Sequence, residues 1–404
     1  YPIVLVHGFM GGWNPELFGV ENLRAVGDFS WIGLGKGPQF PSGDDWWMLP
    51  EDNDSTWGHF ARSLDTLEYD RGFVFDSTQA GEVEDKEYFV FFYDWRDPVS
   101  VNSDGLENYI QQVKRGTNSP KVNVVSHSMG GLVTRGYINE MGEKEYKDDI
   151  ARFVMAGTPN LGAASSVDRW YGGYIDMSSG TNLFMRWYLK VLSGLDRNLN
   201  QSERRNVIQQ QVPSVRDLLP VYKGAIQLSK FTNEQGFYRE PWSVQENIFL
   251  NEMNRKEDNN PMSSVETLAV AGTNRETLEE VYLEEDDFQR VDNDILWKFK
   301  WADKWYHHYR GIKKEVDSGD GTVLEKSVSR DNKYNSHVID SPTAHTEVIG
   351  KGVNEILDFL KIDRRGTDYN ALWQDPSISD KTLSFEVDSP LFLEVTLPGG
   401  TILS

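Results

Sequence analysis

Short runs of apolar residues recur along the chain, and helical patterns separate several of them. Each run is nearly continuous in β-branched and aromatic residues, which is typical of a parallel strand covered on both faces. The runs occupy residues 3–6, 89–93, 122–125, 152–156 and 267–271, and a further run at 336–340 could be the last strand. Helical spacing appears at residues 60–67, 106–113 and 132–141, with a closing helix from Ile349 to Leu360. This alternation predicts an α/β fold, a mainly parallel sheet flanked by helices.

Two regions interrupt the alternation, and the end of the chain changes character. Residues 163–265 are too many for a loop without secondary structure, so we expect a mostly helical cap or lid there. Residues 12–56, rich in Trp, Gly and Pro, are expected to form an ordered irregular loop at the carboxyl edge of the sheet. Alternating apolar residues in 363–404 predict a C-terminal β-hairpin. The predicted core is therefore discontinuous, formed by 1–162 and 266–362.

Composition narrows the class of protein. The 404 residues are 38% hydrophobic and 26% charged, as in a globular protein, and no apolar run reaches the length of a membrane span. The absence of cysteine excludes disulfides, thiolate metal sites and a cysteine nucleophile. The net charge of −22 argues against nucleic acid and anionic membranes as partners.

The beginning of the chain shows no signal peptide, because it opens on apolar residues with no basic segment before them. We expect any targeting segment to have been removed. A solvated acidic surface suits a saline or extracellular setting, so the expected location is extracellular or periplasmic.

The strongest local signal for chemistry is the segment SHSMGG, residues 126–131, placed between a predicted strand and a predicted helix. A nucleophile elbow requires this context, with the serine in a tight turn and small residues two positions to either side. Gly130 meets the demand, while Ser126 stands where a glycine is usual. We therefore predict Ser128 as the nucleophile.

A second segment, HGFMGG at residues 7–12, follows the first predicted strand. Acyl transfer places negative charge on the carbonyl oxygen, and two backbone N–H groups stabilise it. In this architecture the donors are expected to be those of Phe9 and Met129. His7 is expected to shape the loop rather than to act as a base.

A serine nucleophile needs a histidine base, and the base needs an acid to fix its tautomer. His345 precedes the closing helix, where the base belongs, whereas His337 lies inside a predicted strand. Among the acids upstream, Asp320 is flanked by glycines in a compact turn, and Asp317 is the alternative. The order Ser128, Asp320, His345 is the one that this fold uses.

These segments, together with FYDWR at residues 92–96 and GDGTV at 319–323, resemble the lecithin:cholesterol acyltransferase-like lipases of the α/β-hydrolase superfamily. Residues 156–162, AGTPNLG, are also similar to a segment of bacterial lipases. The resemblance covers the core but neither the cap nor the C-terminal hairpin. It implies hydrolysis or transfer of fatty acyl esters, with no cofactor.

Other residues are assigned with this resemblance in view. Asp94 and Arg96 are expected to form a buried ion pair that braces the end of a strand. Aromatic residues of the cap and of the Trp-rich loop are expected to line an acyl pocket, and the substrate-binding candidates are Trp13, Trp170 and Trp187.

No metal site is expected. The acidic run at 284–287, followed by Asp292 and Asp294, lacks the glycine and the spacing of a calcium-binding loop. His307 and His308 are adjacent in the sequence and would diverge in a strand or a helix.

The sequence thus favours a serine carboxylic-ester hydrolase acting on lipids or other apolar esters, with transient contact with a lipid interface. Two alternatives stay open at this point. The same site could transfer the acyl group to a sterol or lysolipid alcohol, or the chain could be a non-catalytic binding protein on a hydrolase scaffold. The acyl chain length, the head group and the oligomeric state are not determined by the sequence.

Overall fold

The computed structural model describes most of the predicted core and part of the predicted cap. The described residues are 1–13, 47–48, 56–72, 84–141, 149–173, 188–189, 192–194, 199–228, 246–259, 265–286, 308–373, 395–396 and 402–403.

A six-stranded sheet forms the centre of the molecule, in the order β11-β8-β6-β5-β1-β4. Its strands are β1 (Ile3–Val6), β4 (Tyr88–Phe91), β5 (Val122–His127), β6 (Ile150–Ala156), β8 (Glu266–Thr273) and β11 (Ser336–Pro342). Every neighbouring pair is parallel. The six predicted strands and the predicted parallel α/β sheet are therefore confirmed.

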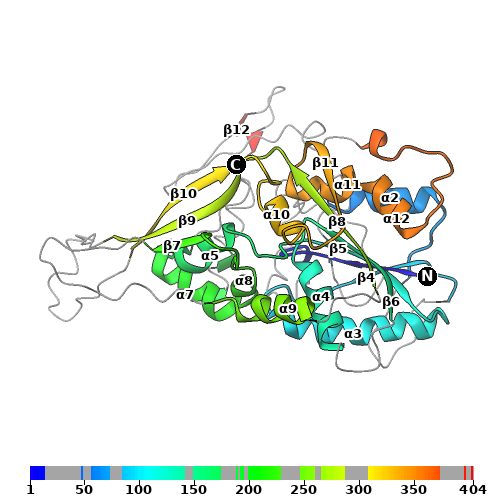
Figure 1. The fold of residues 1–404 in the computed structure, drawn as a ribbon, viewed down its shortest axis with the longest axis horizontal. Coiled ribbons are helices and arrows are strands. Elements are labelled where there is room, and N and C mark those ends of the chain that lie inside the picture. The colour runs from blue at the N-terminus through cyan, green and yellow to red at the C-terminus, as the bar shows by residue number, and fades with distance from the viewer. Residues whose placement is uncertain are drawn as a thin grey trace, which may run out of the picture.

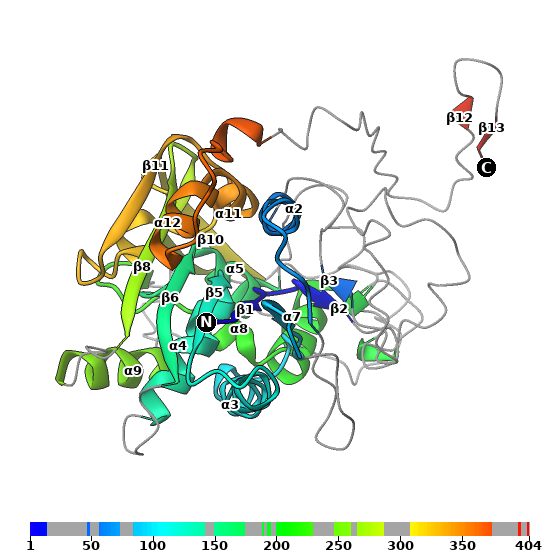
Figure 2. The ribbon, with the colours of Figure 1, turned by 90° about the vertical axis from the view of Figure 1, so that its right-hand side faces the viewer.

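Helices cover both faces of this sheet, which explains why the strands β1, β4 and β5 are buried along their whole length. One face carries α3 (Val99–Gly116), α4 (Met129–Met141) and α9 (Ile248–Asn259), as Figures 1 and 2 show. The opposite face carries α2 (Gly58–Thr66), α11 (Val348–Lys351) and α12 (Val353–Leu360). Alternate strand residues enter different cores: Val4 and Val124 pack on the α3 side, whereas Leu5 and Val125 pack on the α12 side.

The closing helix differs from the prediction in one respect. It was expected to be continuous, but Gly352 separates α11 from α12. The Gly352 N–H donates to the carbonyls of Val348 and Ile349, and a Cβ on Gly352 would lie 3.0 Å from the Val348 carbonyl oxygen. The apolar spacing alone could not show this break, because both short helices bury the same side.

A second sheet of three strands lies beside the main sheet, and the sequence pattern did not predict it. It consists of β7 (Ile226–Leu228), β9 (Thr277–Asp286) and β10 (His308–Val316), in the order β10-β9-β7. In Figure 1 β9 and β10 extend away from the main sheet as a long ribbon. Since β7 comes from residues 163–265 and β9 from the second part of the core, this sheet joins the two predicted segments.

The described part of residues 163–265 is mostly helical. Besides β7 and α9 it contains α5 (Ser165–Gly172), α7 (Gln201–Gln211) and α8 (Ser214–Asp217). Whether 163–265 forms a separate cap stays a prediction.

The remaining elements are short. They are β2 (Gly12–Trp13), β3 (Trp47–Met48), α10 (Glu325–Val328), η2 (His345–Glu347), η3 (Asn370–Leu372), β12 (Val395–Thr396) and β13 (Ile402–Leu403). β2 pairs with β3 inside the Trp-rich segment, and most of that segment lies outside the described residues. β12 and β13 form an antiparallel pair near the C-terminus. The strand predicted near residues 383–387 lies outside the described residues.

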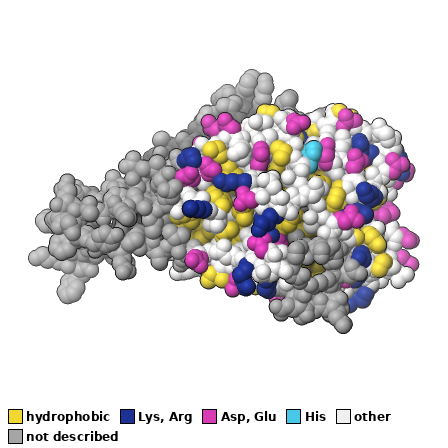
Figure 3. All heavy atoms as spheres, viewed as in Figure 1, with side chains coloured by type: hydrophobic (Ala, Val, Ile, Leu, Met, Phe, Trp, Pro, Cys, Tyr) yellow, Lys and Arg dark blue, Asp and Glu magenta, His cyan; other side chains and the backbone are white. Residues whose placement is uncertain are grey.

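The described surface carries both signs of charge. On the face in Figure 3, acidic and basic side chains are interspersed over the described atoms. Among the described helices, none combines the length and the apolar character needed to cross a membrane.

Candidate active site

Ser128 lies in the tight turn between β5 and α4, with a backbone φ of 53°. A serine in this left-handed region is strained, and such strain is typical of functional turns. Gly130 permits the turn, because a Cβ there would lie 2.4 Å from the Val6 and His7 carbonyl oxygens of the first strand and its loop. Ser126 is accommodated because its hydroxyl lies 2.9 Å from the Thr134 hydroxyl on α4.

Three predicted residues meet in space. His345 Nε2 lies 2.8 Å from Ser128 Oγ, and His345 Nδ1 lies 2.7 Å from Asp320 Oδ2. The carboxylate accepts the Nδ1 hydrogen, which leaves Nε2 free to accept the serine proton. The side chain of Asp320 is fully buried, whereas that of His345 is 15% exposed, so of the two only the imidazole is accessible from outside.

The turn that holds Asp320 is built by backbone donors. Asp320 Oδ1 accepts hydrogen bonds from the N–H groups of Thr322 (2.9 Å) and Val323 (2.7 Å), so that Oδ2 points at His345. The Thr277 hydroxyl accepts from the Gly321 N–H at 2.8 Å and thereby braces the turn from β9. Thr277 could not be singled out from the sequence, because β9 was not predicted.

His345 stands at the start of η2, directly after β11. Glu347 fixes this loop, since its carboxylate accepts from the Ala344 N–H at 2.8 Å. The alternative base His337 points elsewhere, with its Nε2 3.8 Å from Glu355 on α12.

The two predicted oxyanion donors flank the nucleophile. Met129 is the first residue of α4, where a helix leaves its N–H groups without acceptors. The Phe9 N–H forms no hydrogen bond with the described residues. Its neighbour Gly8 passes so close to the nucleophile that a Cβ on Gly8 would lie 2.8 Å from Ser128 Cβ.

Residues 92–96 shape this oxyanion loop. The Tyr93 ring stacks on the His7 imidazole at 4.1 Å between centroids, and its hydroxyl donates to the His7 carbonyl at 2.5 Å. Trp95 is fully buried and meets the Phe9 ring edge-on at 4.8 Å. The position of His7 therefore agrees with the expectation that it shapes the loop.

Asp94 and Arg96 form the expected ion pair, with a separation of 2.5 Å. Arg96 Nη1 also donates to the Tyr188 hydroxyl at 3.0 Å. Burial lowers the pKa of the Arg96 guanidinium, but the hydrogen bonds and charges of Asp94 and Tyr188 together outweigh burial and raise that pKa. The pair thus ties the end of β4 to the predicted cap.

The structure gives less information on the three tryptophans predicted to bind substrate than on the triad residues. Trp170 lies on α5 and is buried in the main hydrophobic cluster. Trp13 belongs to β2, and Trp187 lies outside the described residues. Their roles in substrate binding stay predictions.

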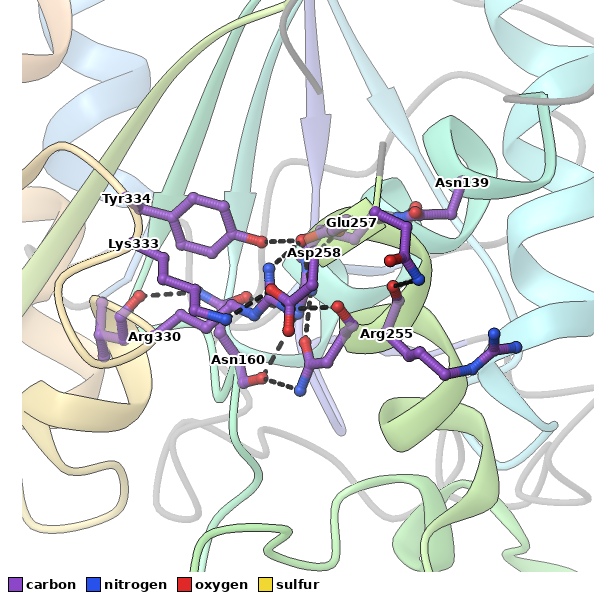
Figure 4. A network of polar contacts seen from close by, with 12 residues as sticks. Asn139, Asn160, Arg255, Glu257, Asp258, Arg330, Lys333 and Tyr334 are labelled. Carbon is purple, nitrogen blue, oxygen red and sulfur yellow. Dashed lines mark hydrogen bonds and ion pairs between the residues drawn. The ribbon is translucent and has the colours of Figure 1, made fainter. Parts of the chain in front are cut away.

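A buried polar network behind the site was not predicted from the sequence (Figure 4). Glu257 on α9 accepts two hydrogen bonds from Arg135 on α4, at 2.9 and 2.8 Å, and one from Arg330 at 2.8 Å. Tyr334 and Asn139 also donate to this carboxylate. Burial alone would raise the Glu257 pKa, but Arg135 and the hydrogen bonds from Tyr334 and Asn139 hold it below its usual range.

The network reaches the loop beneath the triad. Arg135 Nη1 donates to Asn160 Oδ1 at 3.1 Å, and Asn160 Nδ2 donates to the Val328 carbonyl at 2.7 Å. It thereby connects α4, the loop after β6 and the segment that follows the acid turn. Only its separate residues are visible in the sequence, because Arg135, Glu257 and Arg330 lie in three separate segments of the chain.

No group of three or more potential metal ligands occurs among the residues that the structure describes. Glu284 to Asp286 belong to β9, while Asp292, Asp294 and His307 lie outside those residues.

Replacing Gly157 by alanine is expected to lower kcat about tenfold or more, because a small displacement of a reacting group is costly. Gly157 has φ +59°, and a Cβ would lie 3.1 Å from His345 Nδ1 and 3.4 Å from Asp320 Oδ2. Steady-state kinetics of the purified variant measure the effect. Gly366→Ala is the matched control, since Gly366 has φ +78° and nothing within 4 Å of the added Cβ. Equal kcat in both variants would contradict the expectation.

The free energy of unfolding is expected to decrease as the pH is lowered below about 6.5, because the folded protein buries neutral histidines. Burial lowers the His7 pKa from 6.5 to about 4, although the hydrogen bond to the Gly8 carbonyl opposes the shift. Between these values the unfolded chain binds a proton that the folded protein does not, so acid favours unfolding, by about 1.4 kcal/mol per pH unit. Urea unfolding at about pH 7 and at about pH 5 measures how much free energy of unfolding is lost between the two. This loss should be about 2 kcal/mol smaller in His7→Gln than in the wild type. An equal loss in both proteins would contradict this assignment.

The sheet order, the helices on both faces and the elbow at Ser128 define an α/β-hydrolase fold. The family model described as lecithin:cholesterol acyltransferase matches residues 72–226, which confirms the resemblance stated from the sequence. The expectation that the resemblance excludes the cap was wrong, because the match extends over residues 163–226 of that segment. The matched range contains Ser128 and ends before Asp320 and His345.

Comparison with solved structures finds one with a TM-score above 0.5. The chain resembles a structure described as the Tle4–Tli4 complex, with 12% identity and a TM-score of 0.51, over 91% of this chain and 99% of that chain. It also resembles the mature lipase BlEst2 of Bacillus licheniformis, with 14% identity and a TM-score of 0.41, over 90% and 92% of the two chains. No curated protein matches the sequence.

Proposed function

We propose that the protein is a lipolytic serine carboxylic-ester hydrolase that works through an acyl-enzyme on Ser128. One observation carries the proposal: a continuous hydrogen-bonded chain from Ser128 through His345 to the buried Asp320, with Ser128 in a strained left-handed turn. The strain costs stability and is retained where a nucleophile must be presented.

Each residue has a defined part in the reaction. Ser128 Oγ attacks the ester carbonyl carbon while His345 Nε2 takes the hydroxyl proton, and the carbonyl oxygen becomes an oxyanion. The N–H groups of Phe9 and Met129 stabilise that charge. The intermediate collapses, His345 returns the proton to the leaving alcohol, and the acyl group stays on Ser128. Water, deprotonated by His345, then releases the acid.

Asp320 acts on His345 alone. Its buried carboxylate keeps the Nδ1 hydrogen in place and stabilises the imidazolium that forms in each half-reaction. The reaction therefore needs no metal and no cofactor.

The substrate class is proposed from the family match and from the sequence. The matching model describes an acyltransferase that uses lecithin, which favours fatty acyl esters such as glycerides and phospholipids. An extracellular or periplasmic location is part of the same proposal.

Hydrolysis of p-nitrophenyl esters from butyrate to palmitate, above and below their solubility limits, tests this function. We expect release that increases toward longer chains and rises at the solubility limit, where a lipid interface forms. If no ester in the series were cleaved and a fluorophosphonate failed to label Ser128, a non-catalytic binding protein would be the better interpretation.

Acyl transfer to an alcohol is the second candidate, because the matching family model carries that activity in its description. Product analysis with a sterol or a lysolipid present distinguishes the two. Ester products at the expense of free fatty acid would favour the transferase.

A further inference from the structure

His127 is the residue before the nucleophile and the last residue of β5. It is buried, with 7% of its surface exposed, and its Nε2 lies 2.9 Å from the backbone carbonyl oxygen of His345. A carbonyl oxygen can only accept, so Nε2 carries the hydrogen and donates it. The sequence suggested no role for this histidine.

The His127 ring fills the space between the loops that carry the oxyanion donor and the base. Its centroid lies 4.8 Å from that of His345, and Trp57 meets it edge-on at 6.5 Å. A Cβ on Gly8 would lie 3.2 Å from His127 Nδ1, so the oxyanion loop passes on this side.

The base loop is held on both sides of His345. The Ala344 N–H donates to the Glu347 carboxylate, and the Thr346 carbonyl accepts from the Thr56 N–H. The hydrogen bond from His127 acts between these points, on the carbonyl of His345 itself, the residue from which the catalytic imidazole projects.

We propose that His127 is a positioning residue whose Nε2–H holds the His345 backbone, and with it the separation between His345 Nε2 and Ser128 Oγ. This inference rests on the proposed function of the triad. It assigns to His127 a hydrogen bond to the base rather than a contact with the substrate.

The charge state of His127 suits this task. Burial, and after it the charge of His345, lower its pKa to about 3, although the hydrogen bond to the His345 carbonyl opposes the shift. His127 thus stays neutral while His345 holds the serine proton, so no positive charge on His127 repels the His345 imidazolium.

Two substitutions separate the hydrogen bond from the packing. His127→Phe keeps a ring but loses the donor, whereas His127→Gln places an amide donor near Nε2 and loses the ring. We expect kcat to fall about tenfold to a hundredfold in the Phe variant, with KM within about twofold, because the base is displaced. The Gln variant should keep kcat within about threefold of the wild type.

His59 supplies the matched control. It is also a buried histidine whose Nε2 donates to a backbone carbonyl, that of Tyr369 at 2.7 Å, in the segment after α12. The His59→Phe variant loses the same kind of hydrogen bond away from the triad, so kcat per folded molecule should not change.

The rate of fluorophosphonate labelling of Ser128, per folded molecule, gives a second readout that does not depend on the choice of ester. If the Phe variant yields no folded protein, His127→Met replaces it as a variant without a donor. Equal labelling rates in the wild type, the Gln variant and the donor-free variant would overturn the positioning role of His127 and leave the proposed function intact. The positioning role would also be overturned if the Gln variant lost as much kcat as the Phe variant. Absence of labelling in the wild type would overturn the proposed function as well.

Discussion

Replacing Ser128 by alanine is expected to lower kcat for ester hydrolysis by about 10⁴- to 10⁶-fold, as removal of the nucleophile does in other triad enzymes. The acyl-enzyme cannot form without Oγ, while the oxyanion donors of Phe9 and Met129 remain to give a small residual rate. The fold should persist, because alanine meets the same backbone strain at φ 53° and fills less space.

The measurement is kcat on a p-nitrophenyl ester together with the midpoint of thermal unfolding. Ser103→Ala is the matched control: Ser103 is buried on α3, and its hydroxyl lies 2.9 Å from the carbonyl oxygens of Val99 and Val133. We expect wild-type kcat in this control. Activity above about one per cent in the Ser128 variant would indicate a different nucleophile, because removing the true nucleophile costs far more.

Replacing Glu257 by glutamine is expected to lower the free energy of unfolding by about 3–5 kcal/mol, the usual cost of leaving a buried charge without its partner. The Glu257 side chain is 2% exposed, and those of Arg135 and Arg330 are 0% and 5% exposed. Glutamine keeps the shape but removes the negative charge that both guanidinium groups share. Asp258 replaces the lost charge only in part, because its side chain is 46% exposed and it pairs with Arg330 but not with Arg135.

Urea unfolding of the purified variant measures this loss. The matched control is Glu68→Gln, whose partner Arg365 lies at the same 2.8 Å but with side chains 57% and 78% exposed. There the expected loss is much smaller than in the Glu257 variant, since solvent screens an exposed pair. Similar losses in the two variants would show that the buried network does not carry the stability assigned to it.

The sequence predicted most of the main sheet because its signals are local. Short apolar runs of four to eight residues favour buried strands, and five such runs became β1, β4, β5, β6 and β8, while the weaker run at 336–340 became β11. The small sheet escaped prediction for the opposite reason. β9 and β10 are rich in charge, as in the segments TLEEVYLEED and HYRGIKKEV, and their pairing joins residues that no local pattern links.

By itself the sequence determined which residues are candidates for the site and in what order they occur. The elbow at 126–131 and the glycine-flanked turn at Asp320 are backbone requirements, and only a few residue types meet them. Only the tertiary structure decided that His345 lies 2.8 Å from Ser128 across 217 positions of chain. It also decided that His127 holds the His345 carbonyl and that Glu257 binds Arg135 and Arg330. Such contacts follow from how the elements pack, and a hydrogen bond between distant residues leaves no periodicity in the sequence.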